Sequence, residues 1–173
     1  MIIVERVLIS KSIYSQVEGR ITIRWSRPEI QPDLPKNIPY IAGKSERYIN
    51  FRFFMQSDHF AGIDELYEID LDKGIDLPPF GKSIDVFGDG SLWAISSSGH
   101  SKGHVMYFIN GIEDKVLMTG DACNTLFQFE NGVGPGYFSS DLEQTQDVLD
   151  QIIEFKELYP EVKLVFGHDL QSC

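Results

Sequence analysis

The chain has few cysteines, few basic side chains and no long apolar run. Its 173 residues include two cysteines, Cys123 and Cys173, which show no CxxC spacing and no framework of pairs, so we expect both to be reduced thiols. Lys and Arg number 15 against 26 Asp and Glu, a formal net charge of −11. Such a charge argues against nucleic acid and against an anionic membrane surface as partners.

The N-terminal segment lacks the basic region and the cleavage site of a signal peptide, and no later apolar run reaches membrane-spanning length. The sequence therefore predicts a cytoplasmic protein. Its length and ordinary apolar content predict one domain, residues 1–173, with a substantial core.

Apolar and polar residues alternate in three neighbouring segments, 92–95, 105–109 and 116–118, which predicts three consecutive strands joined by tight turns. His100 follows the first of these strands and Asp121 follows the third. Side chains at such strand ends can converge at one rim of a sheet, where loops usually carry chemistry.

A further short apolar strand, residues 162–166, ends in Gly167-His168-Asp169 and supplies a third candidate. Imidazole and carboxylate groups suit zinc, iron or manganese, and two histidines with one carboxylate form the smallest plausible ligand set. Two structural alternatives remain open: His100 as an ordinary loop residue, and Asp121 as a turn residue that bonds nearby backbone.

Several motifs occur in a characteristic order: GHSKGH at 99–104, TGDA at 119–122, a helix, and GHD at 167–169, preceded by DVFGDGSLWAI at 85–95. This order resembles the C-terminal half of the metallo-β-lactamase superfamily, and most of all its lactonase-type hydrolases. The resemblance implies an α+β fold, the metallo-β-lactamase-like αββα sandwich, with a dinuclear metal site at one edge.

By the same resemblance, His100 is a ligand of the first ion and His168 is a ligand of the second. Asp121 bridges the two ions, which also makes it the candidate catalytic residue. His104 matches a histidine that orients its neighbours and is not itself a ligand. Zinc is the expected cofactor, with iron or manganese as alternatives.

The upstream ligand motif of the superfamily is degenerate here. A strand like residues 4–10 ends in HxHxDH in the family, whereas this sequence places Lys11, Ile13, Ser15 and Gln16 at the four ligand positions. A cation, a side chain without donor atoms and two weak neutral oxygens do not replace imidazole or carboxylate. We therefore expect the dinuclear site to be impaired or lost, with reduced metal occupancy or none.

A second alignment register stays open. Ser57-Asp58-His59-Phe60-Ala61-Gly62 resembles the end of the same motif and would add Asp58 and His59 to the second ion. Against this register, Phe54 and Gln56 occupy the upstream histidine positions, and a surface Asp-His pair remains the alternative.

Superfamily members usually carry further N-terminal strands, so we expect a domain truncated at the N-terminus, with its N-terminal strands missing. An uncovered sheet face then predicts a homodimer or a second chain that covers it. Residues 20–35 are strand-like before prolines interrupt them, and no function follows from them.

Two helices are also expected. Residues 44–54 show a helical pattern, and the capping box Ser140-Asp141-Leu142-Glu143 opens a helix that ends before Pro160. On this second helix, Leu142, Thr145, Leu149 and Ile152 share one side.

Three functional hypotheses follow. The first is a metal-dependent hydrolase in which an activated water attacks an ester, lactone or thioester carbonyl of a small molecule. The second is a catalytically silent binding or assembly protein that keeps the fold, with the ammonium of Lys11 paired with Asp121. The third is an unrelated α/β binding module.

Overall fold

The computed structural model describes residues 2–4, 21–23, 40–46, 48–49, 57–58 and 66–169. Lys11, Ile13, Ser15, Gln16 and His59 lie outside these residues, so the degenerate motif and the second alignment register stay predictions. The chain forms two compact units, Met1–Ala42 with Arg47–Ile69 and Gly43–Glu46 with Asp70–Cys173.

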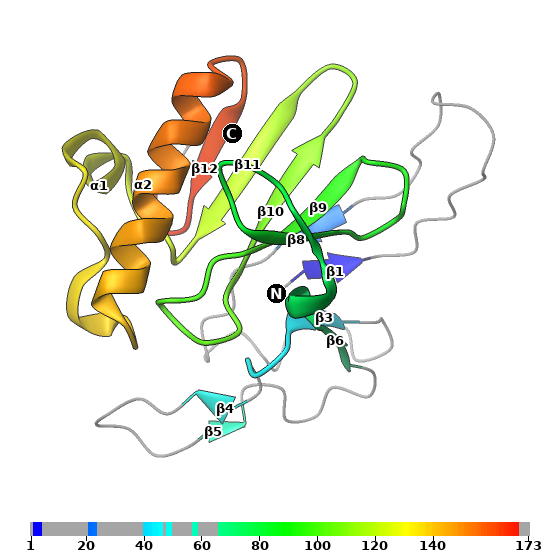
Figure 1. The fold of residues 1–173 in the computed structure, drawn as a ribbon, viewed down its shortest axis with the longest axis horizontal. Coiled ribbons are helices and arrows are strands. Elements are labelled where there is room, and N and C mark those ends of the chain that lie inside the picture. Colours follow the sequence, from blue (N-terminus) through cyan, green and yellow to red (C-terminus); the bar gives the residue numbers. More distant parts are fainter. Residues whose placement is uncertain are drawn as a thin grey trace. The chain divides into compact units, whose positions relative to one another are not determined.

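The first unit contains a four-stranded sheet in the order β2-β1-β3-β6 and a separate pair of strands. The four strands are β1 (Ile2–Val4), β2 (Ile21–Ile23), β3 (Tyr40–Gly43) and β6 (Leu66–Ile69) (Figure 1). The separate pair joins β4 (Tyr48–Ile49) to β5 (Ser57–Asp58).

The helix expected over residues 44–54 was a wrong prediction. The backbone turns after β3, where Glu46 N–H donates to the Gly43 carbonyl at 3.1 Å, and β4 follows. Ser45 has φ +76°, which lies in the left-handed region and is incompatible with a right-handed helix.

The second unit is built on a six-stranded sheet in the order β12-β11-β10-β9-β8-β7. Neighbouring strands from β7 to β11 pair antiparallel, while β12 pairs parallel to β11. The three strands expected near residues 92–118 are present as β9, β10 and β11. The strands span Ile75–Asp76 (β7), Lys82–Asp85 (β8), Leu92–Ser96 (β9), Val105–Asn110 (β10), Lys115–Gly120 (β11) and Lys163–Phe166 (β12).

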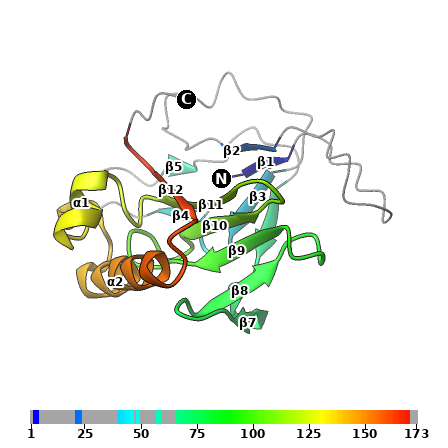
Figure 2. The same cartoon turned by 90° about the horizontal axis from the view of Figure 1, so that it is seen from above.

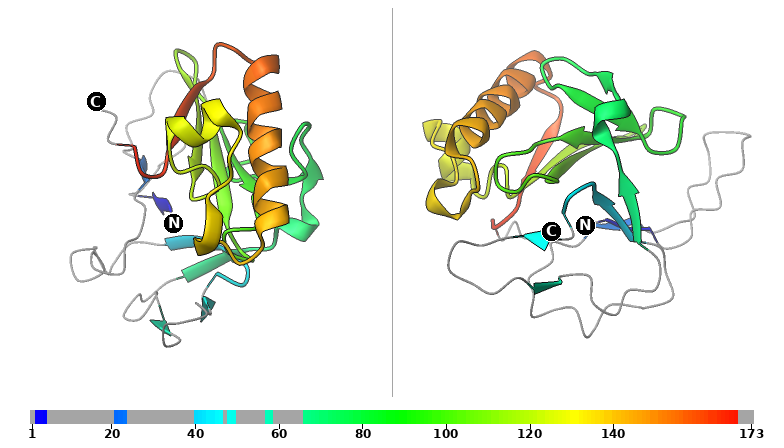
Figure 3. Two further views of the ribbon diagram at one scale, coloured as in Figure 1. Left: turned by 90° about the vertical axis from the view of Figure 1, so that its left-hand side faces the viewer. Right: turned by 60° about the horizontal axis from the view of Figure 1, so that its bottom comes forward.

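Two α-helices connect β11 to β12, as a parallel pair of strands requires. They are α1 (Leu126–Asn131) and α2 (Leu142–Leu158), and α2 lies along one face of the sheet (Figures 2 and 3). Short 3₁₀ turns occur at η2 (Leu71–Lys73) and η3 (Gly136–Phe138). No helix in the described part of the chain is long and apolar enough to cross a membrane.

The core of this unit lies between α2 and the sheet. Side chains spaced three and four apart on α2 pack against side chains that alternate along the strands, which gives the helix its single buried face. Leu142, expected on that face, is 50% exposed, and Val148 takes part in the core instead. The central members of the core are Ile95, Met106, Leu117, Val148, Leu149, Ile152 and Phe155.

Candidate metal centre

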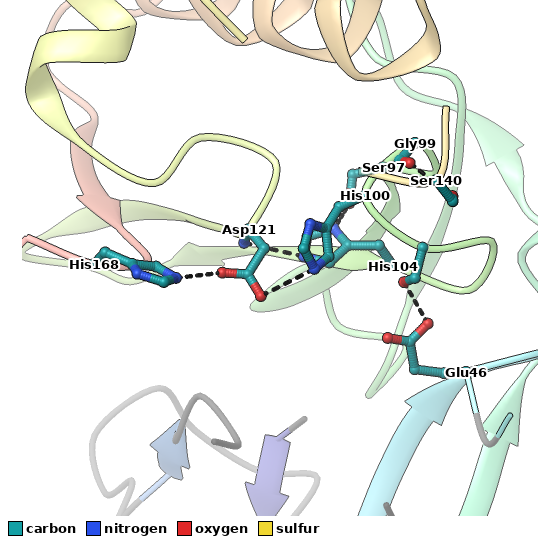
Figure 4. Close-up of polar contacts among 9 residues, drawn as sticks. Glu46, Ser97, Gly99, His100, His104, Asp121, Ser140 and His168 are labelled. Atoms are coloured by element: carbon teal, nitrogen blue, oxygen red, sulfur yellow. Dashed lines mark hydrogen bonds and ion pairs between the residues drawn. The ribbon is translucent and has the colours of Figure 1, made fainter. Parts of the chain in front are cut away.

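The sheet brings the three candidate ligands to one edge. Because β10 is antiparallel to both β9 and β11, and β12 is parallel to β11, the strands β9, β11 and β12 run in the same direction. His100, Asp121 and His168 each follow one of these strands. Their side chains converge there (Figure 4).

Asp121 lies between the two imidazoles. Its Oδ1 is 2.9 Å from Nε2 of His168, and its Oδ2 is 3.5 Å from Nε2 of His100. The side chain of His100 is 15% exposed, that of Asp121 32% and that of His168 49%. The site is therefore closed at His100 and open to solvent at His168.

The approach of β12 to Asp121 depends on small residues and on hydrogen bonds between loops. A Cβ at Gly167 would lie 2.6 Å from the Gly120 carbonyl oxygen, so only glycine permits this contact. His168 N–H donates to the carbonyl of Asn124 at 2.8 Å, which fixes the backbone that carries the imidazole.

His104 holds the backbone of Asp121 by a hydrogen bond. It is 7% exposed, its Nε2 accepts a hydrogen bond from Asp121 N–H at 3.1 Å, and its Nδ1 lies 2.7 Å from Ser97 Oγ. Since a backbone N–H can only donate, the neutral ring carries its proton on Nδ1 and donates it to Ser97. Burial lowers the pKa of His104 to about 4, and the carboxylate of Asp121 opposes this only in part.

The ring of His100 has one polar partner among the described residues, Asp121. Its Nδ1 is buried and has no hydrogen-bond partner among the described residues. Besides Asp121, the ring meets the edge of His104, with centroids 5.8 Å apart. The loop 97–104 therefore sets the position of this imidazole.

Two residues that hold this loop were not identified from the sequence. Ser140 Oγ donates to the Gly99 carbonyl at 2.8 Å, and Ser101 Oγ donates to Glu46 at 2.6 Å.

The expected capping box was wrong by one residue, because Asp141 caps α2 by accepting from Gln144 N–H. Ser140 precedes the N-cap, and its hydroxyl donates to the loop instead of accepting from the helix.

The donors suit a metal only as part of a larger set. No group of three His, Cys, Asp or Glu side chains in the described residues surrounds one ion position. Each imidazole instead faces a different oxygen of Asp121, so two ion positions would receive two donors each. Two ligands of one tetrahedral zinc ion lie about 3.3 Å apart, close to both observed separations.

No protein-family profile matches the chain, whereas two further comparisons found similar proteins. N-acyl homoserine lactonase AttM of Agrobacterium fabrum is 33% identical over 86 residues, which are 49% of this chain and 32% of the relative. The AttM lactonase of Rhizobium johnstonii is 35% identical over 65 residues, 37% of this chain and 25% of the relative. The matched segments thus span a third or less of these relatives.

Solved structures resemble the chain over more of its length. An N-acyl homoserine lactone hydrolase with its product N-hexanoyl-L-homoserine at the catalytic metal centre superimposes with a TM-score of 0.58 and 22% identity, covering 79% of this chain and 49% of that one. A quorum-quenching N-acyl homoserine lactone hydrolase gives a TM-score of 0.59 and 23% identity, covering 80% and 52%. The expected α+β fold class is confirmed.

Proposed function

We propose that this protein is a divergent metal-dependent hydrolase with a weakened metal site. The chain resembles the lactonase-type hydrolases of the metallo-β-lactamase superfamily in sequence and in fold. The observation that carries this proposal is the position of Asp121, whose two carboxylate oxygens each face one imidazole, at 2.9 Å and 3.5 Å. His100 and Asp121 would hold one ion, and Asp121 and His168 would hold the other.

Zinc, when bound, supplies Lewis acidity that makes water a nucleophile near neutral pH. Asp121 would hold the ions that activate the water, and the proton that the water loses ends on the leaving oxygen. Water adds to the carbonyl carbon of a lactone, the bond to the ring oxygen breaks, and the released oxygen takes the proton to give a hydroxy acid. The half-exposed His168 side chain is the part of the site that solvent reaches.

The weakness of the site follows from donor number. Structural and catalytic zinc sites use three or four protein ligands per ion, whereas the described residues offer two at each position. The sequence has no imidazole or carboxylate at residues 11–16, and the second alignment register would add Asp58 and His59. We therefore expect lower zinc affinity than a complete dinuclear site provides.

The second candidate is a catalytically silent protein that keeps the fold for binding or assembly. The same shortage of donors favours it. In that case the three side chains would serve as a hydrogen-bonded cluster, with Asp121 accepting from both imidazoles.

Metal binding separates the two candidates. The full chain is purified without added metal, its metal content is determined by elemental analysis, and zinc is then titrated calorimetrically into chelator-treated protein. Asp121→Ala and His168→Ala should abolish binding. Asp114→Ala is the matched control, because this exposed carboxylate precedes β11 whereas Asp121 follows it.

Activity is then measured on the zinc-loaded protein with an N-acyl homoserine lactone, the compound class named for the similar proteins, and with simple esters and thioesters. Hydrolysis that is lost in Asp121→Ala and kept in Asp114→Ala supports the hydrolase. Wild-type protein that neither contains metal nor binds added zinc rules it out and favours the silent protein.

A further inference from the structure

The loop 97–104 presents His100 without help from a hydrogen bond to the ring. Nδ1 of His100 has no partner in the described part of the chain, and Nε2 faces only Asp121. Metal-ligating histidines usually donate their second ring N–H to a carboxylate or carbonyl, which fixes the ring. Without such a bond, the position of this ring depends on the backbone that carries it, together with its contacts to Asp121 and His104.

The start of α2 holds that backbone from one side. Ser140 N–H donates to the His100 carbonyl at 3.0 Å, and Asp141 N–H donates to the Gly99 carbonyl at 2.9 Å. Ser140 Oγ adds a second hydrogen bond to the Gly99 carbonyl at 2.8 Å. Gly99 has φ +140°, and a Cβ there would lie 2.6 Å from Thr145 Oγ1, so loop and helix are in direct contact.

The turn after β3 holds the loop from another side. Glu46 accepts a hydrogen bond from Ser101 Oγ, the residue next to His100, at 2.6 Å. A Cβ at Gly103 would lie 2.5 Å from the Lys44 carbonyl oxygen and 2.7 Å from Glu46 N, so turn and loop are packed backbone to backbone. Figure 4 shows Glu46 and Ser140 reaching the loop from separate elements.

We propose that Ser140 and Glu46 are positioning residues that hold the loop so that His100 faces Asp121 before any metal binds. The expected effect of these two residues on metal affinity rests on the proposed function of the site. Their effect on the position of the His100 ring can be tested without metal.

The first test is NMR of the His100 and His168 ring signals in metal-free protein. We expect a single, sharp His100 signal in the wild type. Ser140→Ala and Glu46→Ala should broaden or split this signal and leave that of His168 unchanged. The controls are Ser139→Ala, whose Oγ has no partner in the described residues, and Glu157→Ala, an exposed carboxylate on α2. Neither control should alter either ring.

Conservative variants distinguish positioning from general stability. Ser140→Thr keeps the hydroxyl and Glu46→Gln keeps an oxygen acceptor, so both should restore a single His100 signal. Ser140 is exposed and does not cap α2, so its alanine variant should keep the wild-type melting temperature. Ser101→Ala breaks the contact with Glu46 from the loop side and gives an independent variant should Glu46→Ala not fold.

The second test is zinc affinity, which should fall about 10-fold in Ser140→Ala and Glu46→Ala and remain unchanged in the controls. If wild-type protein binds no zinc, the proposed function fails while the ring signals still decide the positioning role. A His100 signal that stays single and sharp in both alanine variants and in Ser101→Ala overturns the inference.

Discussion

The backbone N–H of Asp121 donates to Nε2 of His104, at 3.1 Å. A buried, neutral imidazole thus supports the backbone of the carboxylate that lies between His100 and His168. The conformation of the loop after β11 depends on a residue that does not touch the open part of the site.

His104→Ala should lower the free energy of unfolding by about 2–4 kcal/mol, because it leaves a partly buried N–H of Asp121 without its acceptor and creates a cavity. Chemical denaturation monitored by Trp fluorescence measures the change. His168→Ala is the comparison, since its side chain is 49% exposed and its loss should cost less than about 1 kcal/mol. Equal costs for the two variants would contradict the supporting role of His104.

Gly99→Ala should destabilise the protein by at least about 2 kcal/mol, because φ +140° is strained for alanine and the new Cβ would overlap Thr145. Gly132→Ala is the matched control: Gly132 also has positive φ, +62°, but open space around it. The two thermal melting curves, compared with that of the wild type, check the prediction. It is wrong if the control loses as much stability as the Gly99 variant.

Asp141→Ala should lower the free energy of unfolding by about 1 kcal/mol, since it removes the oxygen that accepts from Gln144 N–H at the start of α2. Ser140→Ala should change the free energy of unfolding by less than about 0.5 kcal/mol, because Ser140 is not the cap. Urea titrations of both variants decide which residue caps the helix. A larger loss of stability in Ser140→Ala than in Asp141→Ala would mean that Ser140 caps the helix.

Leu149→Ala should cost about 2–5 kcal/mol, because Leu149 is fully buried between α2 and the sheet. Leu142→Ala, on the same helix but half exposed, should cost less than about 0.5 kcal/mol. Calorimetric melting of the two variants measures the difference. Similar values would mean that the first turn of α2 packs against the core after all.

Much of the second unit could be predicted from the sequence, because local patterns determine it. Alternation identified β9, β10 and β11, and the direction of consecutive strands placed His100 and Asp121 at one edge. Helical spacing identified α2 and most of its buried face.

What could not be predicted depends on contacts between distant residues. Ser140 and Glu143 form a recognisable capping box, but the Ser140 hydroxyl donates to Gly99, 41 residues away, and the cap moves to Asp141. The contact of Glu46 with Ser101 spans 55 residues and leaves no trace in local sequence. The left-handed Ser45 likewise lies at the start of a segment whose pattern looks helical.

The parallel pairing of β11 with β12 places Asp121 and His168 at the two ends of one crossover, 47 residues apart. Such long-range parallel pairs form slowly, because the intervening chain must be ordered first. A ligand held jointly by these two side chains would bind only after the crossover has closed. Ion binding and completion of the sheet are then thermodynamically linked, and local detachment of β12 would release the ion while the hairpins remain folded.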